Sequence, residues 1–144
     1  MLLLLACGKI PYYSETHAFA DGTWGSGEMP KFSFEVKDSL DVYDMSFVLR
    51  LNTDYEYQNI WLLMHTTQPE GVMSTDTINI LICDEKGKWL GKKSGANYTF
   101  TGVFALQHRF NALGKHTIAI EHAVMNPLLK GVLDLSLVIE KSKG

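Results

Sequence analysis

Hydrophobic and polar residues alternate along several stretches of the chain, a period-2 pattern that places successive side chains on opposite faces of a β-strand. In "KFSFEVKD", Phe32, Phe34 and Val36 share one face. In "DMSFVLRLN", one face is apolar and the opposite face is mostly polar. The apolar set is Met45, Phe47, Leu49 and Leu51, and the opposite set is Ser46, Val48, Arg50 and Asn52. Both stretches predict half-buried strands.

The other strands are predicted from composition and from the turns between them. "NIWLLMHT" is apolar on both faces, as a central strand is, and "VMSTDTINILICD" is long and rich in β-branched residues. The stretches "TTQPEG" and "DEKGK" supply turn chemistry. Three further strand patterns are "NYTFTGVFALQHRF", "KHTIAIEHA" and "VLDLSLVIEK". No window keeps the apolar stripe of an amphipathic helix. We therefore predict an all-β fold, an antiparallel β-sandwich of about eight strands, with which a jelly-roll order is compatible.

The last predicted strand has the clearest alternation. Its apolar face holds Leu133, Leu135, Leu137 and Ile139, and its polar face holds Asp134, Ser136 and Glu140. A one-residue shift of register would exchange these two faces. We therefore expect a charge at position 135 to be far more damaging than a charge at position 136.

The chain begins with a short apolar run, "MLLLLACGKIPYY". A membrane-spanning helix needs roughly 20 apolar residues, so this run is too short to be one. Leu4, Leu5, Ala6 and Cys7 instead have the form of a bacterial lipoprotein signal, with a small residue before the cut and a thiol to take the diacylglyceryl chain. We interpret residues 1–6 as the remnant of a signal peptide, 7–29 as a lipidated tether and 30–144 as the sandwich domain. The alternative is an apolar start without such a role.

Composition narrows the functional classes. The 144 residues carry a net charge of −3, with 46% hydrophobic and 20% charged residues. This length favours one domain with a real core, and the weak negative charge argues against nucleic acid as a partner.

Candidate chemistry is sparse. Cys83 lies in an apolar strand pattern and is expected to be a buried thiol, while His116 and His122 share a face of one strand but lie about 20 Å apart along it. We expect strand-end and surface histidines rather than a metal site. There is no nucleophile elbow, phosphate loop or clustered cysteine pattern, so we predict no enzyme activity, no catalytic residue and no cofactor.

Loop aromatics are the remaining resource. Tyr55, Tyr57 and Trp61 lie near one predicted loop, and Trp89 lies between glycines in another. Such rings can stack on sugars, anchor a protein partner or cover the ends of the core. We expect Trp61 to be a core plug and Tyr55 or Tyr57 to contact a partner, and we leave Trp89 open.

Several of these segments resemble the GldH-type gliding-motility lipoproteins. The resemblance rests on "RLNTDYEYQNIW", on "PEGVMSTDTINILICDEKGKWLG", on "GVLDLSLVIEK" and on the N-terminal Cys followed by "YYSETHAFADGTW". It covers nearly the whole chain after Cys7. His116 departs from the family pattern, which prefers Tyr at that place.

The resemblance implies a non-enzymatic accessory protein of the gliding and type IX secretion machinery. It implies lipidation at Cys7, anchoring through acyl chains in the bacterial cell envelope, at the periplasm or outer membrane, and partners among other envelope lipoproteins or that machinery. The implied motif positions are Arg50, Asn52, Tyr55, Asn59, Trp61 and Trp89. Arg50 is expected to bond a carboxylate such as Asp54 or Asp76.

Three functional hypotheses remain open at this point. The first is a protein-interaction component of the envelope, the second is a carbohydrate-binding sandwich, and the third is an enzyme or metal protein on the same fold. Exposed coplanar rings in a groove would favour the second hypothesis. Converging histidines or carboxylates would favour the third.

Overall fold

The computed structural model describes residues 10–142. Leu4, Leu5, Ala6 and Cys7, which carry the predicted signal and acylation site, lie outside the described residues. Within the described range, no helix has the length and apolar character needed to cross a membrane.

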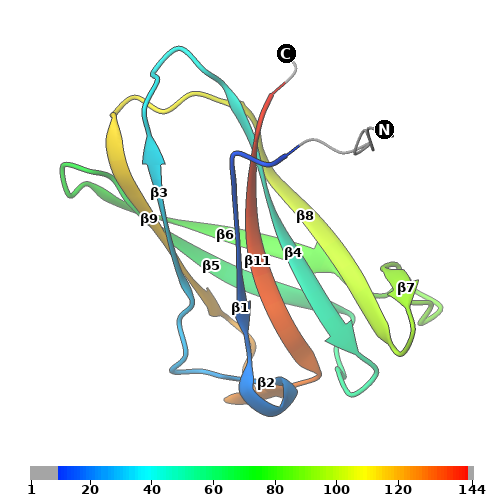
Figure 1. Ribbon diagram of the computed structural model, residues 1–144. Coiled ribbons are helices and arrows are strands. Elements are labelled where there is room, and N and C mark those ends of the chain that lie inside the picture. Colours follow the sequence, from blue (N-terminus) through cyan, green and yellow to red (C-terminus); the bar gives the residue numbers. More distant parts are fainter. Residues whose placement is uncertain (1–9, 143–144) are drawn as a thin grey trace, which may run out of the picture.

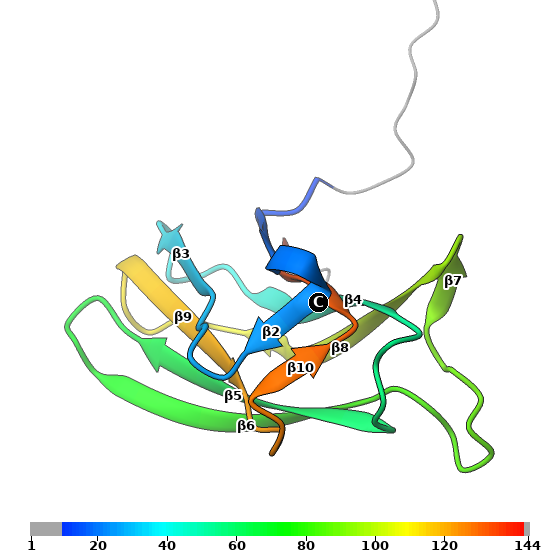
Figure 2. The same ribbon diagram turned by 90° about the horizontal axis from the view of Figure 1, so that it is seen from below.

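Two antiparallel sheets face one another (Figure 1). The first is five-stranded, in the order β1 (Tyr13–Ala18), β11 (Val132–Lys141), β4 (Tyr43–Asn52), β8 (Asn97–His108) and β7 (Lys92–Ser94). The second is four-stranded, in the order β3 (Lys31–Val36), β9 (Gly114–His122), β5 (Asn59–Thr67) and β6 (Met73–Leu81). At one end a two-stranded ribbon of β10 (Leu128–Lys130) and β2 (Thr23–Gly25) follows the short 3₁₀ helix η1 (Ala20–Gly22), as Figure 2 shows.

The strand order is that of a jelly roll. With the three-residue strands β2, β7 and β10 set aside, the main strands in chain order are β1, β3, β4, β5, β6, β8, β9 and β11. The sheets then contain the first, last, third and sixth of these strands, and the second, seventh, fourth and fifth. This is the double Greek-key arrangement of two packed sheets, and it confirms the predicted antiparallel sandwich.

The core lies between the sheets and is built by the predicted alternation. Phe32, Phe34 and Val36 are buried, as are the four predicted apolar residues of β4. In β11, Leu135, Leu137 and Ile139 pair in register with Leu49, Phe47 and Met45 of β4. A register shift between Val132 and Asp134 turns Leu133 away from the fully buried set, so Val132 takes the inward place at the start of this strand.

The first part of the predicted tether is an integral part of the sandwich. β1 pairs with β11 over six residues, from Tyr13 opposite Ile139 to Ala18 opposite Asp134. Farther along, Trp24 is fully buried, stacks on Phe19 at 4.6 Å between ring centroids, and donates its indole N–H to the carbonyl of Glu28 at 2.7 Å. β1 and the Trp24 contacts thus help to complete the core, so residues of the segment predicted as a tether pack with the sandwich.

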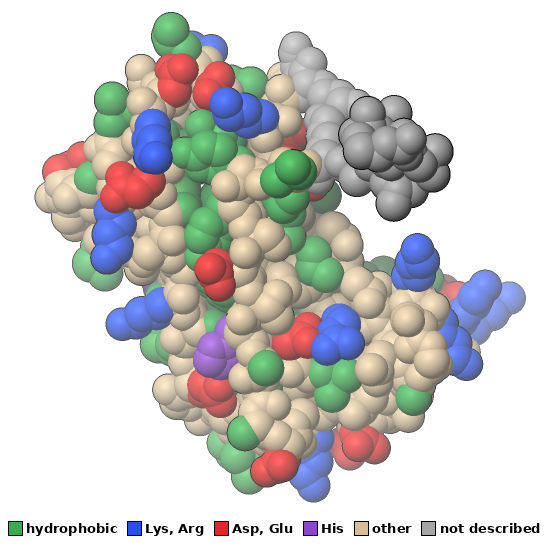
Figure 3. All heavy atoms as spheres, in the orientation of Figure 1, with side chains coloured by type: hydrophobic (Ala, Val, Ile, Leu, Met, Phe, Trp, Pro, Cys, Tyr) green, Lys and Arg blue, Asp and Glu red, His purple; other side chains and the backbone are tan. Residues whose placement is uncertain are grey.

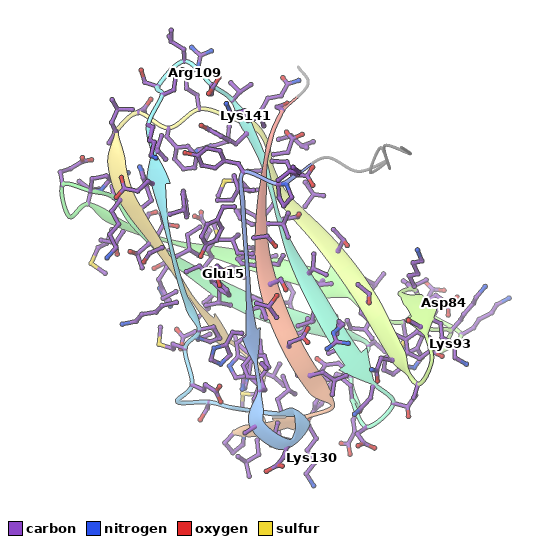
Figure 4. All side chains as sticks on the ribbon, viewed as in Figure 1. Glu15, Asp84, Lys93, Arg109, Lys130 and Lys141 are labelled. Atoms are coloured by element: carbon purple, nitrogen blue, oxygen red, sulfur yellow. The ribbon has the colours of Figure 1, made fainter. Side chains whose placement is uncertain are left out.

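The loops gather at two ends of the sandwich. Figure 4 shows Lys130 at one end, where β4 ends and β10 lies, and Arg109 at the other end, just after β8. On the face seen in Figure 3, Lys and Arg side chains are interspersed with Asp and Glu rather than gathered by sign.

Candidate functional site: an inter-sheet cleft

Arg50 joins two strands of the larger sheet on its outer face. Antiparallel pairing sets Arg50 of β4 opposite Asp134 of β11. The Arg50 Nε donates to both carboxylate oxygens of Asp134, at 3.0 and 2.9 Å, and Nη2 donates to Oδ2. This hydrogen bonding, followed by the charge of Asp134, raises the pKa of Arg50. The expectation of Asp54 or Asp76 as the partner was wrong, because cross-strand register and not sequence proximity decides it.

The loop after β4 holds Asn52 and Tyr55 in structural contacts. Asn52 Oδ1 accepts the backbone N–H of Asp54 at 2.9 Å, which closes a turn. Tyr55 is only 4% exposed and donates its hydroxyl to the carbonyl of Asn59 at 2.7 Å. Gly131, at φ +84°, packs against this loop, where an added Cβ would lie 2.3 Å from the Tyr55 nitrogen. The Tyr55 ring is therefore part of the core rather than of a contact surface.

Tyr57 and Trp89 are the more accessible members of the predicted set. Tyr57 lies edge-on to Tyr55 at 5.7 Å, and its hydroxyl accepts from the Asn126 side chain at 3.5 Å. Trp89 is partly buried, with its ring 4.7 Å from that of Tyr98 and 6.0 Å from that of Phe100. The five predicted contact residues thus belong to the end of the sandwich that holds the loop after β4 and the Trp89 connection, and they do not form a single pocket there.

Trp61 was expected to plug the core, and the structure corrects this. Ile60 and Leu62 take the inward positions of β5, so Trp61 projects from the outer face and is 45% exposed. We expect Trp61→Ala to change the free energy of unfolding by no more than about 0.5 kcal/mol, because the ring covers no core. Chemical denaturation with an unchanged m-value is the measurement. A loss of 3 kcal/mol or more, typical of a buried ring, would contradict this placement.

The histidines of β9 are buried, contrary to the expectation of surface positions. His116 and His122 do share the inward face, and they are 2% and 6% exposed. His122 Nε2 donates to the carbonyl of Trp24 at 3.1 Å, and its Nδ1 accepts the Val124 N–H at 3.3 Å. In the described part of the chain, no group of three or more His, Cys, Asp or Glu side chains could hold a metal ion.

These contacts predict a pH dependence of stability. Burial lowers the pKa of His122, and burial followed by the nearby His116 lowers the pKa of His108, each from 6.5. The unfolded chain then binds more protons below that value, so stability is full above pH 6.5 and is lost as the pH falls. The melting temperature should drop between pH 7.5 and pH 5, and less steeply in His122→Gln. A melting temperature that rises on acidification would contradict the assignment.

An open cleft lies between the two sheets at the end of the sandwich where Arg109 lies, away from the residues predicted to contact a partner or ligand. Its volume is about 460 Å³. It forms because β6 and β8 approach where Ile80 meets Gly102 and then diverge (Figure 1). Exposure of the inward-facing residues of β6 increases toward the open end of the cleft. Ile80 is buried, Ile78 is half-buried, and Asp76 and Ser74 are exposed.

The cleft has an apolar floor and a polar rim. The apolar side chains include Phe34, Phe104, Phe110, Met45, Met64 and Ile78. The rim includes Gln68, Ser74, Asp76, His108, Arg109 and Asn111. The rings near the rim are packed on one another, with Phe110 at 4.8 Å from His116 and 4.7 Å from His108. His116 is committed to structure here, because its Nε2 donates to the carbonyl of Ala112 at 2.9 Å.

Sequence reasoning missed this cleft, although one signal was present. Along the inner face of β6 the residues change from Ile80 and Ile78 to Asp76 and Ser74. Polar residues at inward positions of a strand indicate that the facing sheet has moved away. The matching residues on β8 lie far along the chain, so only the fold brings the two walls together.

The fold and the cleft define a jelly-roll β-sandwich domain with an opening between its sheets. The chain belongs to the GldH lipoprotein family, whose profile matches residues 11–139. It is therefore a member of a family of gliding-motility lipoproteins, a class of proteins attached to the cell envelope by lipid. The resemblance described from the sequence is confirmed.

Two relatives show the extent of the similarity. A gliding motility lipoprotein GldH homolog from Christiangramia forsetii is 27% identical over 149 residues, which cover 99% of this chain and 91% of the relative. The gliding motility lipoprotein GldH of Flavobacterium johnsoniae is 23% identical over 147 residues, which cover 97% of this chain and 91% of the relative. The similarity is thus not confined to one motif.

Proposed function

We propose that the protein is a lipid-anchored accessory of the gliding-motility and type IX secretion machinery and acts by binding another envelope protein. The family match over residues 11–139 supports the gliding context. The observation that carries the binding role is the open cleft of about 460 Å³, whose apolar floor and polar rim have the character of a recognition site.

The anchor in this proposal is Cys7. Two or three acyl chains would hold the protein at the membrane, at about 0.8 kcal/mol per buried methylene. We expect the protein from its native gene to sediment with membranes and Cys7→Ser to appear in the soluble or unprocessed fraction. Fractionation with immunoblotting is the measurement. Equal membrane partitioning and normal processing of Cys7→Ser would exclude this anchor.

The binding role is tested by capture of the anchored protein after cross-linking in cells. We expect a discrete envelope protein to co-purify in constant proportion, and to be missing from a capture with an unrelated lipoprotein that carries the same tag. Capture of the same proteins in the same proportions with both baits would contradict a specific binding role.

A carbohydrate-binding role is the second candidate, and one observation favours it. The Trp61 ring is exposed on the outer face of β5, with Asn79 of β6 opposite it and Asn59 Nδ2 donating to Asn79 Oδ1 at 2.8 Å. An exposed ring beside amide groups suits a pyranose. Glycan binding that Trp61→Ala abolishes at an unchanged melting temperature would support this candidate.

A further inference from the structure

Strand β8 has a largely unpaired edge beside the cleft. β8 spans 12 residues, but β7 pairs with it only over Asn97–Thr99. On the other side of the cleft, β6 pairs with β5 alone. In the described residues 10–142, no further strand covers either edge. The two strands that border the cleft therefore both present backbone groups that could pair with another chain.

The unpaired edge of β8 lacks the usual protection against pairing with another strand. Exposed strand edges are usually protected by charges, proline or a covering segment. The second half of β8 instead reads "VFALQ" and carries no charge from Val103 to Gln107. Val103 and Leu106 are 58% and 70% exposed, and Met73 at the start of β6 is 71% exposed. An edge of this kind suits strand addition.

The cleft is large enough to hold several apolar side chains. A cavity of 150 Å³ holds one benzene molecule, so 460 Å³ has room for roughly three groups of that size. Alternate residues of an extended strand lie about 6.6 Å apart and point to the same face. Two or three apolar side chains of one added strand would therefore fit between the sheets, above Phe104 and Met64.

The rim of the cleft carries one acidic and one basic side chain on different walls. Asp76 lies on the β6 wall and Arg109 just beyond the end of β8, and both line the cleft. Neither side chain forms an ion pair with another residue in the described range. An occupant with a basic group toward Asp76 and an acidic group toward Arg109 would complement both walls.

We propose that the cleft receives an extended segment of another protein, which adds as a strand to the free edge of β8 and inserts alternate apolar side chains between the sheets. This inference rests on the proposed binding function and names its site and ligand class. A peptide pairs with the strand edge through its backbone, which a sugar cannot do in register. The rings that line the cleft are those of Phe34, Phe104 and Phe110, with the imidazoles of His108 and His116 packed on Phe110. The rim of the cleft is too polar for an acyl chain alone.

The test uses the full chain and a displayed library of random ten-residue peptides. We expect selected peptides to alternate apolar residues, to carry a basic residue, and to slow hydrogen exchange at Val103–His108. Asp76→Lys should weaken their binding at least tenfold, because it reverses the charge of the wall. Glu85→Lys is the matched control, since it makes a like change in the exposed turn after Cys83. Ala105→Trp, which fills the cleft, should abolish binding.

Three results would overturn the proposal. They are a library without enriched peptides, peptides that bind Asp76→Lys and Ala105→Trp as well as the wild type, and protection of the cleft by chitotetraose in place of peptide. Melting curves ensure that a folded variant is compared. If cross-linked capture yields a specific envelope protein that Asp76→Lys and Ala105→Trp still bind, that result supports the proposed binding function and excludes the cleft as its site. If capture finds none, the proposed function itself fails.

Discussion

Replacement of Leu135 by Asp is expected to unfold the domain. Leu135 is fully buried in β11 and pairs with Leu49 of β4 at the centre of the core. A carboxylate at this position has no partner and loses its hydration, so we expect a loss of at least ~4 kcal/mol, close to the whole stability of a small domain. Circular dichroism and thermal melting of purified protein are the measurements.

Ser136→Asp is the matched control for this prediction. Ser136 lies on the outer face, where its hydroxyl is 2.6 Å from that of Thr16. We expect this change to cost about 1 kcal/mol, the value of one hydrogen bond. A domain that tolerates Leu135→Asp, or that is damaged more by Ser136→Asp, would show that the register of β11 is shifted by one residue.

Trp24→Ala should cost about 3 to 5 kcal/mol, the usual effect of removing a buried large ring. Trp24 is fully buried, with Phe19 stacked on it, His122 edge-on at 5.2 Å and its indole N–H donated to the carbonyl of Glu28. Its loss removes this packing and leaves the Glu28 carbonyl without a donor. Urea unfolding of the purified variant measures the change in free energy.

The comparison with Trp61→Ala gives this second prediction its control. Both changes remove an indole ring, but Trp61 lies 45% exposed on the outer face of β5 whereas Trp24 is 0% exposed. If the segment before residue 30 were only a tether, Trp24→Ala would be as mild as Trp61→Ala. Equal stabilities for the two variants would therefore contradict the assignment of β2 to the folded domain.

The strands that the sequence predicted well are those with one face fully buried. In β3, β4 and β11, apolar side chains return at every second residue because each strand packs that face on the opposite sheet. β1 escaped prediction because it is an edge strand whose central inner-side residue, Glu15, remains exposed. The strand β2 is three residues long, too short for any periodic signal.

The site could be predicted only in part. Arg50 and Asn52 were found as polar residues opposite a buried face, but the partner of Arg50 depends on the pairing of β4 with β11, which no local pattern specifies. The cleft depends on the divergence of β6 from β8, a property of the sheet geometry. Its charged residues are Asp76, on strand β6, and Arg109, in the loop after β8. In the sequence, neither residue differs from an ordinary charged surface residue.

Site-specific photo-cross-linking in living cells tests the central claim most directly. A photoreactive phenylalanine replaces Ser74, which is exposed on β6 and lines the cleft, and in a parallel strain replaces Lys115, which is exposed on β9. The account predicts a discrete cross-linked product between position 74 and another envelope protein, with no such product from position 115. Identical products from both positions, or none from position 74 in a folded and membrane-attached protein, would contradict it.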